Sequence, residues 1–226
     1  MSRITIFTGN YGSGKTEIAL NMAMNEAKNK PVTLVDLDIV NAYFRSSEKK
    51  EMLEAAGVKV LHSTFALKSV DLPSLPASID TAFIDKSRTV FFDVGGDPVG
   101  ATALGRYYPR FMEEPYEMLY VVNVRRPFSS TAQDIIAMMG DIEAHSRLRI
   151  TGLINNSNLA RDTDVEDLIE GQQVLKEVVA KTVIPVKYVC GTKDVLDAFV
   201  ERGDVLGEPY VIDIYMRPEW LDTTAE

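Results

Sequence analysis

The sequence predicts an α/β protein with three layers: a mostly parallel sheet of about seven or eight strands, covered by helices on both faces. Two observations predict this fold. Apolar runs of β type alternate with helical patterns along the 226 residues. A glycine-rich phosphate-binding pattern also joins the first strand to the first helix. No linker or internal repeat separates a second domain, so residues 1–226 are expected to form one domain, with a peripheral tail from about 203.

The strands and helices are expected to follow one another in regular order. The expected strands are 3–8, 31–37, 57–61, 88–94, 116–124, 149–155 and 184–189, with a further strand at 209–215. The expected helices are 15–30, 46–56, 76–86, 100–113, 129–146, 164–181 and 193–201. The stretch 62–75, which contains Pro73, is expected to be a loop that leads into a short helix.

Composition limits the partners that the chain can have. A net charge of −9 argues against broad binding to nucleic acids, which needs clustered Lys and Arg. No apolar run approaches the ~20 residues of a membrane span, so a cytoplasmic protein without membrane contact is expected. The single cysteine, Cys190, excludes a disulfide within the chain. His62 and His145 are too isolated to suggest a metal site and are expected at the surface.

The strongest motif is the glycine-rich loop after the first strand. It fits G-x-x-x-x-G-K-[ST] at every fixed position. Its residues, taken with the one that follows, are Gly9, Asn10, Tyr11, Gly12, Ser13, Gly14, Lys15, Thr16 and Glu17. Glycines let backbone N–H groups turn toward phosphate oxygens, and the helix N-terminus adds partial positive charge. Lys15 is therefore expected to reach the β- and γ-phosphates of a nucleotide, and the Thr16 hydroxyl to bind Mg²⁺.

Three carboxylates end two of the apolar strands. Asp36 and Asp38 close the strand 31–37, and Asp93 closes the strand 88–94. Charged groups at the end of a buried strand are costly unless they have partners, and ligands of open α/β folds bind at this edge of the sheet. Asp36 and Asp38 are expected to face Mg²⁺ and the terminal phosphate. Asp93 is in the position of a carboxylate that holds a metal-bound water.

The loops after later strands offer groups for the base and for phosphate. Asn156 follows the strand 149–155 and can recognise a purine through paired donor and acceptor groups. No Asn-Lys-x-Asp motif for guanine occurs there, so adenine is favoured. The backbone at Gly191 is expected to flank the base. Arg125 and Arg126 are expected either to contact phosphate, a partner subunit or an acidic substrate, or to lie in a solvated loop.

These motifs, in this order, give the chain a resemblance to the MinD/ParA/CobQ/nitrogenase-iron-protein class of P-loop NTPases. The matching stretches are the glycine loop, Val35-Asp36-Leu37-Asp38, Asp93-Val94-Gly95-Gly96 and Gly152-Leu153-Ile154-Asn155-Asn156-Ser157. The resemblance implies a P-loop NTPase fold with ATP and Mg²⁺ as cofactors. It also implies that Asp38 orients the attacking water, Asp36 supports the metal and the switch, and Asp93 holds Mg²⁺ through water. The family's adenine-binding asparagine corresponds to Asn156.

One position departs from this class. ATP-dimerising members carry a second lysine where this chain has Asn10, so a dimer completed by that lysine is not expected, although a homodimer of another kind stays open. An arginine (Arg45, Arg125 or Arg126) or a partner protein would have to supply the missing cation. The partner is the favoured source, and the chain is expected to hydrolyse ATP slowly by itself.

The expected function is an ATP-hydrolysing switch or energy-coupling protein that acts on a client protein. Two enzymatic alternatives stay open. One is phosphotransfer or ligation on a small molecule, as in the related dethiobiotin-synthetase and cobyrinate-amidase members. The other is a metallochaperone-type GTPase. The stretch Gly95-Gly96-Asp97 is similar to a motif of those proteins, but their metal-binding His or Cys residues are not evident. A nucleotide-dependent binding module with negligible turnover is the third alternative.

Overall fold

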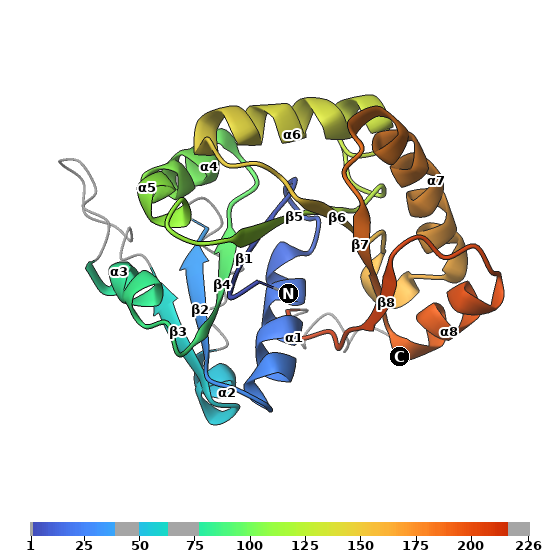
Figure 1. Ribbon diagram of the computed structural model, residues 1–226. Helices are drawn as coiled ribbons and strands as arrows, with labels where there is room; N and C mark the ends of the chain where they lie inside the picture. The colour runs from blue at the N-terminus through green and yellow to red at the C-terminus, as the bar shows by residue number, and fades with distance from the viewer. Residues whose placement is uncertain (1, 39–49, 63–76, 217–226) are drawn as a thin grey trace.

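A computed structural model describes residues 2–38, 50–62 and 77–216 (Figure 1). The described residues form one sheet of eight strands in the order β3-β2-β4-β1-β5-β6-β7-β8, and every neighbouring pair is parallel. The strands are β1 Ile4–Thr8, β2 Val32–Leu37, β3 Val58–His62, β4 Thr89–Val94, β5 Tyr116–Val122, β6 Gly152–Asn155, β7 Val186–Gly191 and β8 Glu208–Val211. The predicted α/β fold with a parallel sheet is confirmed.

Helices connect these strands. They are α1 Lys15–Ala27, α2 Lys50–Ala55, α3 Ala77–Ile84, α4 Pro98–Gly105, α5 Tyr108–Phe111, α6 Ala132–Ser146, α7 Val165–Thr182 and α8 Lys193–Glu201, with a 3₁₀ turn, η2, at Ala160–Asp162. Residues 63–75 of the loop expected at 62–75 lie outside the described residues, as does the beginning of the helix expected at 46–56, whereas His62 ends β3.

Several boundaries differ from the sequence prediction: the helix expected at 15–30 ends at Ala27, the strand expected at 209–215 is only Glu208–Val211, and two later helices differ more. The single helix expected over 100–113 is divided into α4 and α5. Pro109 has no N–H to donate to the carbonyl four residues earlier and its ring clashes with that carbonyl, so the helix is interrupted before it. The helix expected from 129 begins at Ala132, because the Thr131 hydroxyl accepts a hydrogen bond from the Asp134 N–H and caps the helix there.

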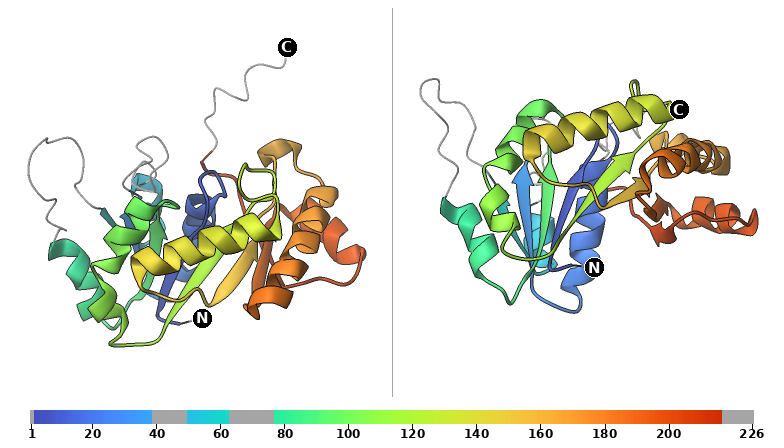
Figure 2. Two further views of the ribbon diagram at one scale, coloured as in Figure 1. Left: turned by 90° about the horizontal axis from the view of Figure 1, so that it is seen from above. Right: turned by 45° about the horizontal axis from the view of Figure 1, so that its top comes forward.

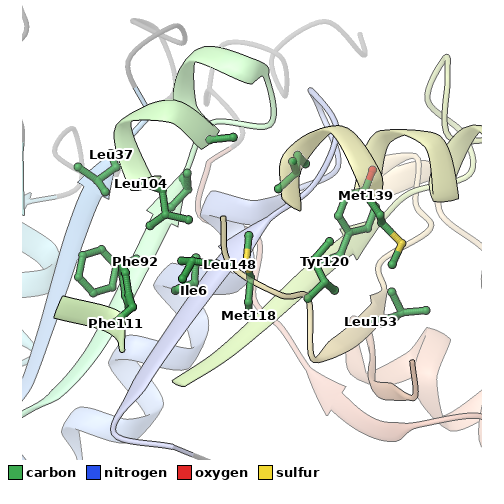
Figure 3. Close-up of a cluster of buried hydrophobic side chains, with 14 of the residues drawn as sticks. Ile6, Leu37, Phe92, Leu104, Phe111, Met118, Tyr120, Met139, Leu148 and Leu153 are labelled. Atoms are coloured by element: carbon green, nitrogen blue, oxygen red, sulfur yellow. The ribbon is translucent and has the colours of Figure 1, made fainter. Parts of the chain in front are cut away.

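Alternating side chains along the strands build a core on each face of the sheet. Ile6 and Phe92 face α3, α4, α5, α6 and α7, whereas Phe7 faces α1 and α2. Figure 3 shows Leu104, Phe111 and Met139 packed over the strands on the first of these faces. Figure 1 places α4, α5 and α6 on one side of the sheet and α1 on the other, and Figure 2 shows α6 lying across the strands. Both faces are therefore covered, as the continuous apolar strands require.

The strand order determines where a ligand can bind. β1 lies between β4 and β5, and the next strand in sequence, β2, lies on the far side of β4. Since all strands are parallel, the loops after β1, β2, β4, β5, β6 and β7 leave the sheet at one edge. Open α/β folds bind their ligands at this edge, where the chain changes direction across the sheet. Within the described ranges, the residues singled out in the sequence for chemistry come from the last residues of these strands, from the loops after them or from the start of α1.

Candidate functional site

The loop between β1 and α1 makes a tight turn. Three of its positions have backbone conformations that only glycine readily adopts. Gly9, Gly12 and Gly14 have φ values of 144°, 72° and 88°, a region that favours glycine. A Cβ atom on Gly14 would lie 2.3 Å from the Asn156 amide, and one on Gly9 would lie 2.3 Å from a backbone carbonyl of β5. Among the described residues no side chain caps α1, so its first N–H groups are available to an anion.

Lys15 is a nearly buried cation at the base of this loop. Its side chain is 6% exposed, and its ammonium donates a hydrogen bond to the Asn10 carbonyl at 3.0 Å. Burial lowers the pKa of Lys15, while the nearby carboxylates of Asp93, Asp38 and Asp97 oppose this shift. The ammonium is therefore held within the loop and beside acidic groups, in a position suited to the outer phosphates of a nucleotide.

Thr16 and Asp93 form a buried polar pair behind Lys15. The Thr16 hydroxyl donates to Oδ2 of Asp93 at 2.7 Å. Burial, and then the neighbouring Asp36, raise the pKa of Asp93 to about 7, against the opposing effects of Thr16 and Lys15. Among the described residues, Oδ1 of Asp93 has no hydrogen-bond partner. A carboxylate oxygen and a hydroxyl beside a phosphate cradle suit Mg²⁺, which takes few protein ligands and keeps its water and phosphate ligands.

Asp36 and Asp38 lie at the same edge of the sheet, but Asp36 is the deeper of the two. Asp36 pairs in register with Asp93 on the adjacent strand, and its Oδ1 accepts a hydrogen bond from the Asp38 N–H at 3.1 Å. Asp38 lines the open cavity, and its Oδ1 lies against Gly95. Asp97 also lines the cavity and caps α4 by accepting from the Gly100 N–H at 2.8 Å. Asp38 thus lies at the surface of the cavity, with Asp36 beneath it.

A cavity of about 650 Å³ opens over these groups, within the range of small-molecule sites. Of the predicted site residues, those that line it are Asn10, Tyr11, Gly12, Gly14, Lys15, Thr16, Glu17, Asp38, Asn156 and Gly191. The other four predicted residues lie behind this wall and contact it: Gly9, Ser13, Asp36 and Asp93. The described residues offer no group of three or more His, Cys, Asp or Glu placed to hold a metal ion without other ligands.

Asn156 links the base side of the cavity to the glycine loop. Its side chain is 2% exposed, and its amide donates to the Ser13 carbonyl at 2.8 Å. The neighbouring Asn155 and Asn158 donate to backbone carbonyls and hold the loop after β6 in shape. The structure therefore assigns Asn156 a contact with the glycine loop, and adenine recognition by this residue stays a prediction.

The sequence analysis did not identify one wall of the cavity. The segment 212–216, directly after β8, crosses the beginning of α1. The Glu17 carboxylate accepts hydrogen bonds from the backbone N–H groups of Tyr215 and Met216 at 2.7 and 3.0 Å. The Asn21 amide exchanges two further bonds with the Asp213 backbone, at 2.9 and 2.8 Å.

The apolar side chains of this segment face the cavity. Ile212, Ile214 and Met216 line it beside the loop after β7, and the Ile212 N–H donates to the Gly191 carbonyl at 2.9 Å. They occupy every second position, which is the period of an extended chain along a surface. That alternation falls largely within the strand expected at 209–215, of which the structure forms only Glu208–Val211 as β8, and it was the sequence signal for this wall. Glu17, predicted only as a nucleotide-binding residue, holds the segment in place.

The three arginines expected as sources of a cation have different surroundings. Arg125 forms ion pairs with Asp167 and Glu170 of α7, at 2.5 and 2.8 Å. Arg126 lines the cavity, and its Nε donates to the Gly12 carbonyl at 3.1 Å. Arg45 lies outside the described residues. His145 is exposed, as expected, and Cys190 is buried in the core.

The fold and the glycine loop together define a P-loop nucleotide-binding protein. The chain belongs to the CobQ/CobB/MinD/ParA nucleotide-binding domain family, whose pattern matches residues 4–188. The resemblance drawn from the motifs is thereby confirmed. No curated protein matches the chain significantly.

Solved structures with a similar fold share little sequence with the chain. The signal recognition particle receptor FtsY of Elizabethkingia anophelis, in complex with GDP, has a TM-score of 0.51 at 18% identity, over 84% of this chain and 57% of that one. FtsY of Thermotoga maritima has a TM-score of 0.53 at 18% identity, over 82% and 60%. The chain thus spans less than two thirds of these receptors. A nucleotide-binding protein of Archaeoglobus fulgidus, in complex with ADP, has a TM-score of 0.50 at 15% identity, over 99% and 93%.

Proposed function

We propose that the chain binds ATP with Mg²⁺, hydrolyses it, and acts as a switch or energy-coupling protein for a client protein. One observation carries the proposal: Lys15 and Thr16 of the phosphate cradle lie beside buried carboxylates at the edge of a cavity of about 650 Å³. A site that only held a nucleotide for structural reasons would not need acidic groups next to its phosphate-binding lysine. Buried charges are costly, so their presence favours a reaction at this edge.

The proposed chemistry is in-line attack of water on the γ-phosphate. Lys15 stabilises the charge that develops on the phosphate oxygens, because its ammonium is already fixed inside the loop. Asp38, on the cavity surface, orients the attacking water, and Asp36 holds the Asp38 backbone from below. Thr16 and Asp93 would hold Mg²⁺, which neutralises phosphate charge when bound.

Adenine is proposed as the base because of what the base side of the cavity contains. This side is formed by the loops after β6 and β7 and by the segment 212–216. The described residues of these three stretches that line the cavity include no Asp or Glu. Guanine presents N–H donors on its Watson–Crick edge, and a guanine-specific site needs an acceptor such as a carboxylate for them. An apolar wall with backbone groups is better suited to adenine.

Parallel calorimetric titrations of the purified chain with ATP and GTP, each with Mg²⁺, test this proposal. Tighter binding of ATP supports it, and a clear preference for GTP would favour the GTPase alternative. Turnover measured against protein concentration tests the switch role. A specific activity that stays low and flat supports a client-dependent ATPase, whereas stimulation by a metabolite would favour the small-molecule transferase alternative.

The client and the location belong to the same proposal. Capture from native extract, with ATP replaced by a non-hydrolysable analogue in one arm, should retain a client protein in a nucleotide-dependent way. No helix in the described ranges is long and apolar enough to span a membrane. A cytoplasmic location, the absence of nucleic-acid partners and the open question of a homodimer all stay as the sequence predicted them.

A further inference from the structure

Two adjacent arginines after β5 have opposite environments. Arg125 extends toward α7, where its guanidinium bonds to Asp167, a nearly buried carboxylate, and to Glu170. Its charge is therefore matched by two acids outside the cavity. Arg126 extends toward the phosphate-binding loop and lines the cavity. Adjacent residues of the same type thus differ in whether their charge is neutralised within the protein.

The loop that carries Arg126 is fixed to the phosphate-binding loop at several points. The Asn10 amide donates to the Pro127 carbonyl at 2.7 Å and to the Ser129 hydroxyl at 3.0 Å. Arg126 Nε donates to the Gly12 carbonyl at 3.1 Å. A Cβ atom on Gly12 would lie 3.3 Å from that Nε, so a glycine leaves room for the arginine. The Arg126 side chain is exposed, and its bond to the Gly12 carbonyl holds the guanidinium beside the cradle at the cavity wall.

Only part of the Arg126 guanidinium is used by these contacts. Within the described residues, Nη1 and Nη2 have no hydrogen-bond partner. A guanidinium offers five N–H donors in a planar fork, which matches two oxygens of a phosphate. Four donors on Arg126 are therefore left for a ligand in the cavity.

The charged residues on the cavity wall favour a second cation as a ligand for the nucleotide. Its charged residues in the described part of the chain are the cations Lys15 and Arg126 and the acids Glu17, Asp38 and Asp97, two against three. The nucleotide brings several more negative charges to a wall that is already acidic. Lys15 is the cation inside the loop, which leaves Arg126 as the second positive side chain on this wall.

We infer that Arg126 is a phosphate ligand of this site: its Nε holds the Gly12 carbonyl while its Nη groups bind oxygens of the nucleotide phosphates. This inference rests on the nucleotide site proposed above. It assigns to an arginine of the same chain the cation that the sequence suggested a partner protein would supply. Arg125, its neighbour, is a structural residue that joins the loop to α7.

The test compares Arg126→Ala, Arg126→Lys and Arg125→Ala in the full chain. Calorimetry measures the affinity for ATP and for inorganic tripolyphosphate, which has no base, at low and high salt. Arg126→Ala should weaken both ligands roughly tenfold, as expected for the loss of charge-assisted hydrogen bonds. It should also flatten the salt dependence, because one ionic contact is lost. Arg126→Lys should recover part of the affinity.

The matched control, Arg125→Ala, removes a neighbouring charge of the same sign. It should lower the melting temperature, because Asp167 loses its partner, and leave both affinities within about twofold of the unaltered chain.

Three results would overturn the inference. An Arg126→Ala protein that binds tripolyphosphate normally but ATP weakly would show that the guanidinium meets the base or ribose. Weaker binding with an unchanged salt dependence would show that Arg126 only shapes the loop. Equal losses in the two alanine variants would show a general effect of charge. If the unaltered chain binds tripolyphosphate but shows no preference for any nucleotide, the proposed ATP function fails while the role of Arg126 still stands.

Discussion

The ligand-free chain should become more stable at alkaline pH when Asp93 is replaced by asparagine. The carboxyl of Asp93 is fully buried, and burial together with Asp36 raises its pKa from 3.8 to about 7. The folded chain therefore keeps a proton between these two pH values that the unfolded chain has released. The contribution of this group to stability is fully present below 3.8 and is lost as the pH rises through 7.

The size of this effect follows from the difference between the two pKa values. The shift from 3.8 to about 7 corresponds to ~4 kcal/mol, at about 1.4 kcal/mol for each pKa unit. Between pH 5 and pH 8 the loss amounts to ~3 kcal/mol. Asparagine is neutral at every pH, and its amide oxygen can still accept the Thr16 hydroxyl. The stability gap between Asp93→Asn and the unaltered chain should therefore widen by ~3 kcal/mol from pH 5 to pH 8 in favour of the variant.

Urea unfolding at pH 5, 6, 7 and 8, followed by circular dichroism without Mg²⁺, measures this gap. Asp141→Asn, a change at an exposed aspartate of α6, is the control and should show no comparable gap. With Mg²⁺ and ATP the order should reverse, since the carboxylate then has a cation to bind and the variant does not. A gap of constant size across the four pH values would refute the reasoning.

Three further changes test other parts of the site. Lys15→Ala should lower ATP affinity at least tenfold, about 1.4 kcal/mol, with the fold intact, and calorimetry that finds no change would contradict the role of the cradle. Gly96→Ala would place a Cβ 1.7 Å from the Gly9 carbonyl, so the loop must move and ATP affinity should fall; a normal titration would count against this packing. Asn21→Ala removes two bonds to Asp213, worth about 0.5–1.5 kcal/mol each, and should weaken ATP but not tripolyphosphate.

The fold and the phosphate side of the site were predictable because their signals are local. The glycine loop must follow a strand and begin a helix, and the helix begins at Lys15 as the motif requires. Asp36, Asp38 and Asp93 close apolar strands, and parallel pairing brings the ends of such strands to one edge. The alternation of strands and helices fixed the class of fold in the same way.

The remaining contacts join parts of the chain that are far apart in sequence. Glu17 meets Tyr215 and Met216, almost 200 residues later, and no local pattern indicates that pairing. The two arginines after β5 are identical in type and adjacent, so only their three-dimensional surroundings distinguish them. Asn156 was expected at the base, but its bond to the Ser13 carbonyl could be seen only once the loops were placed.

The segment 212–216 also has a consequence for the edge of the sheet. β8 forms one edge of the described sheet and is mostly exposed, and such edges can recruit strands from other chains. Because this segment continues directly from β8 and bonds to α1, a nucleotide that packs against it would hold the edge strand in place. Amide hydrogen exchange in β8 should then slow when nucleotide is bound, although no atom of that strand lines the cavity. Occupancy of the site would thus protect the protein against aggregation through its most exposed strand.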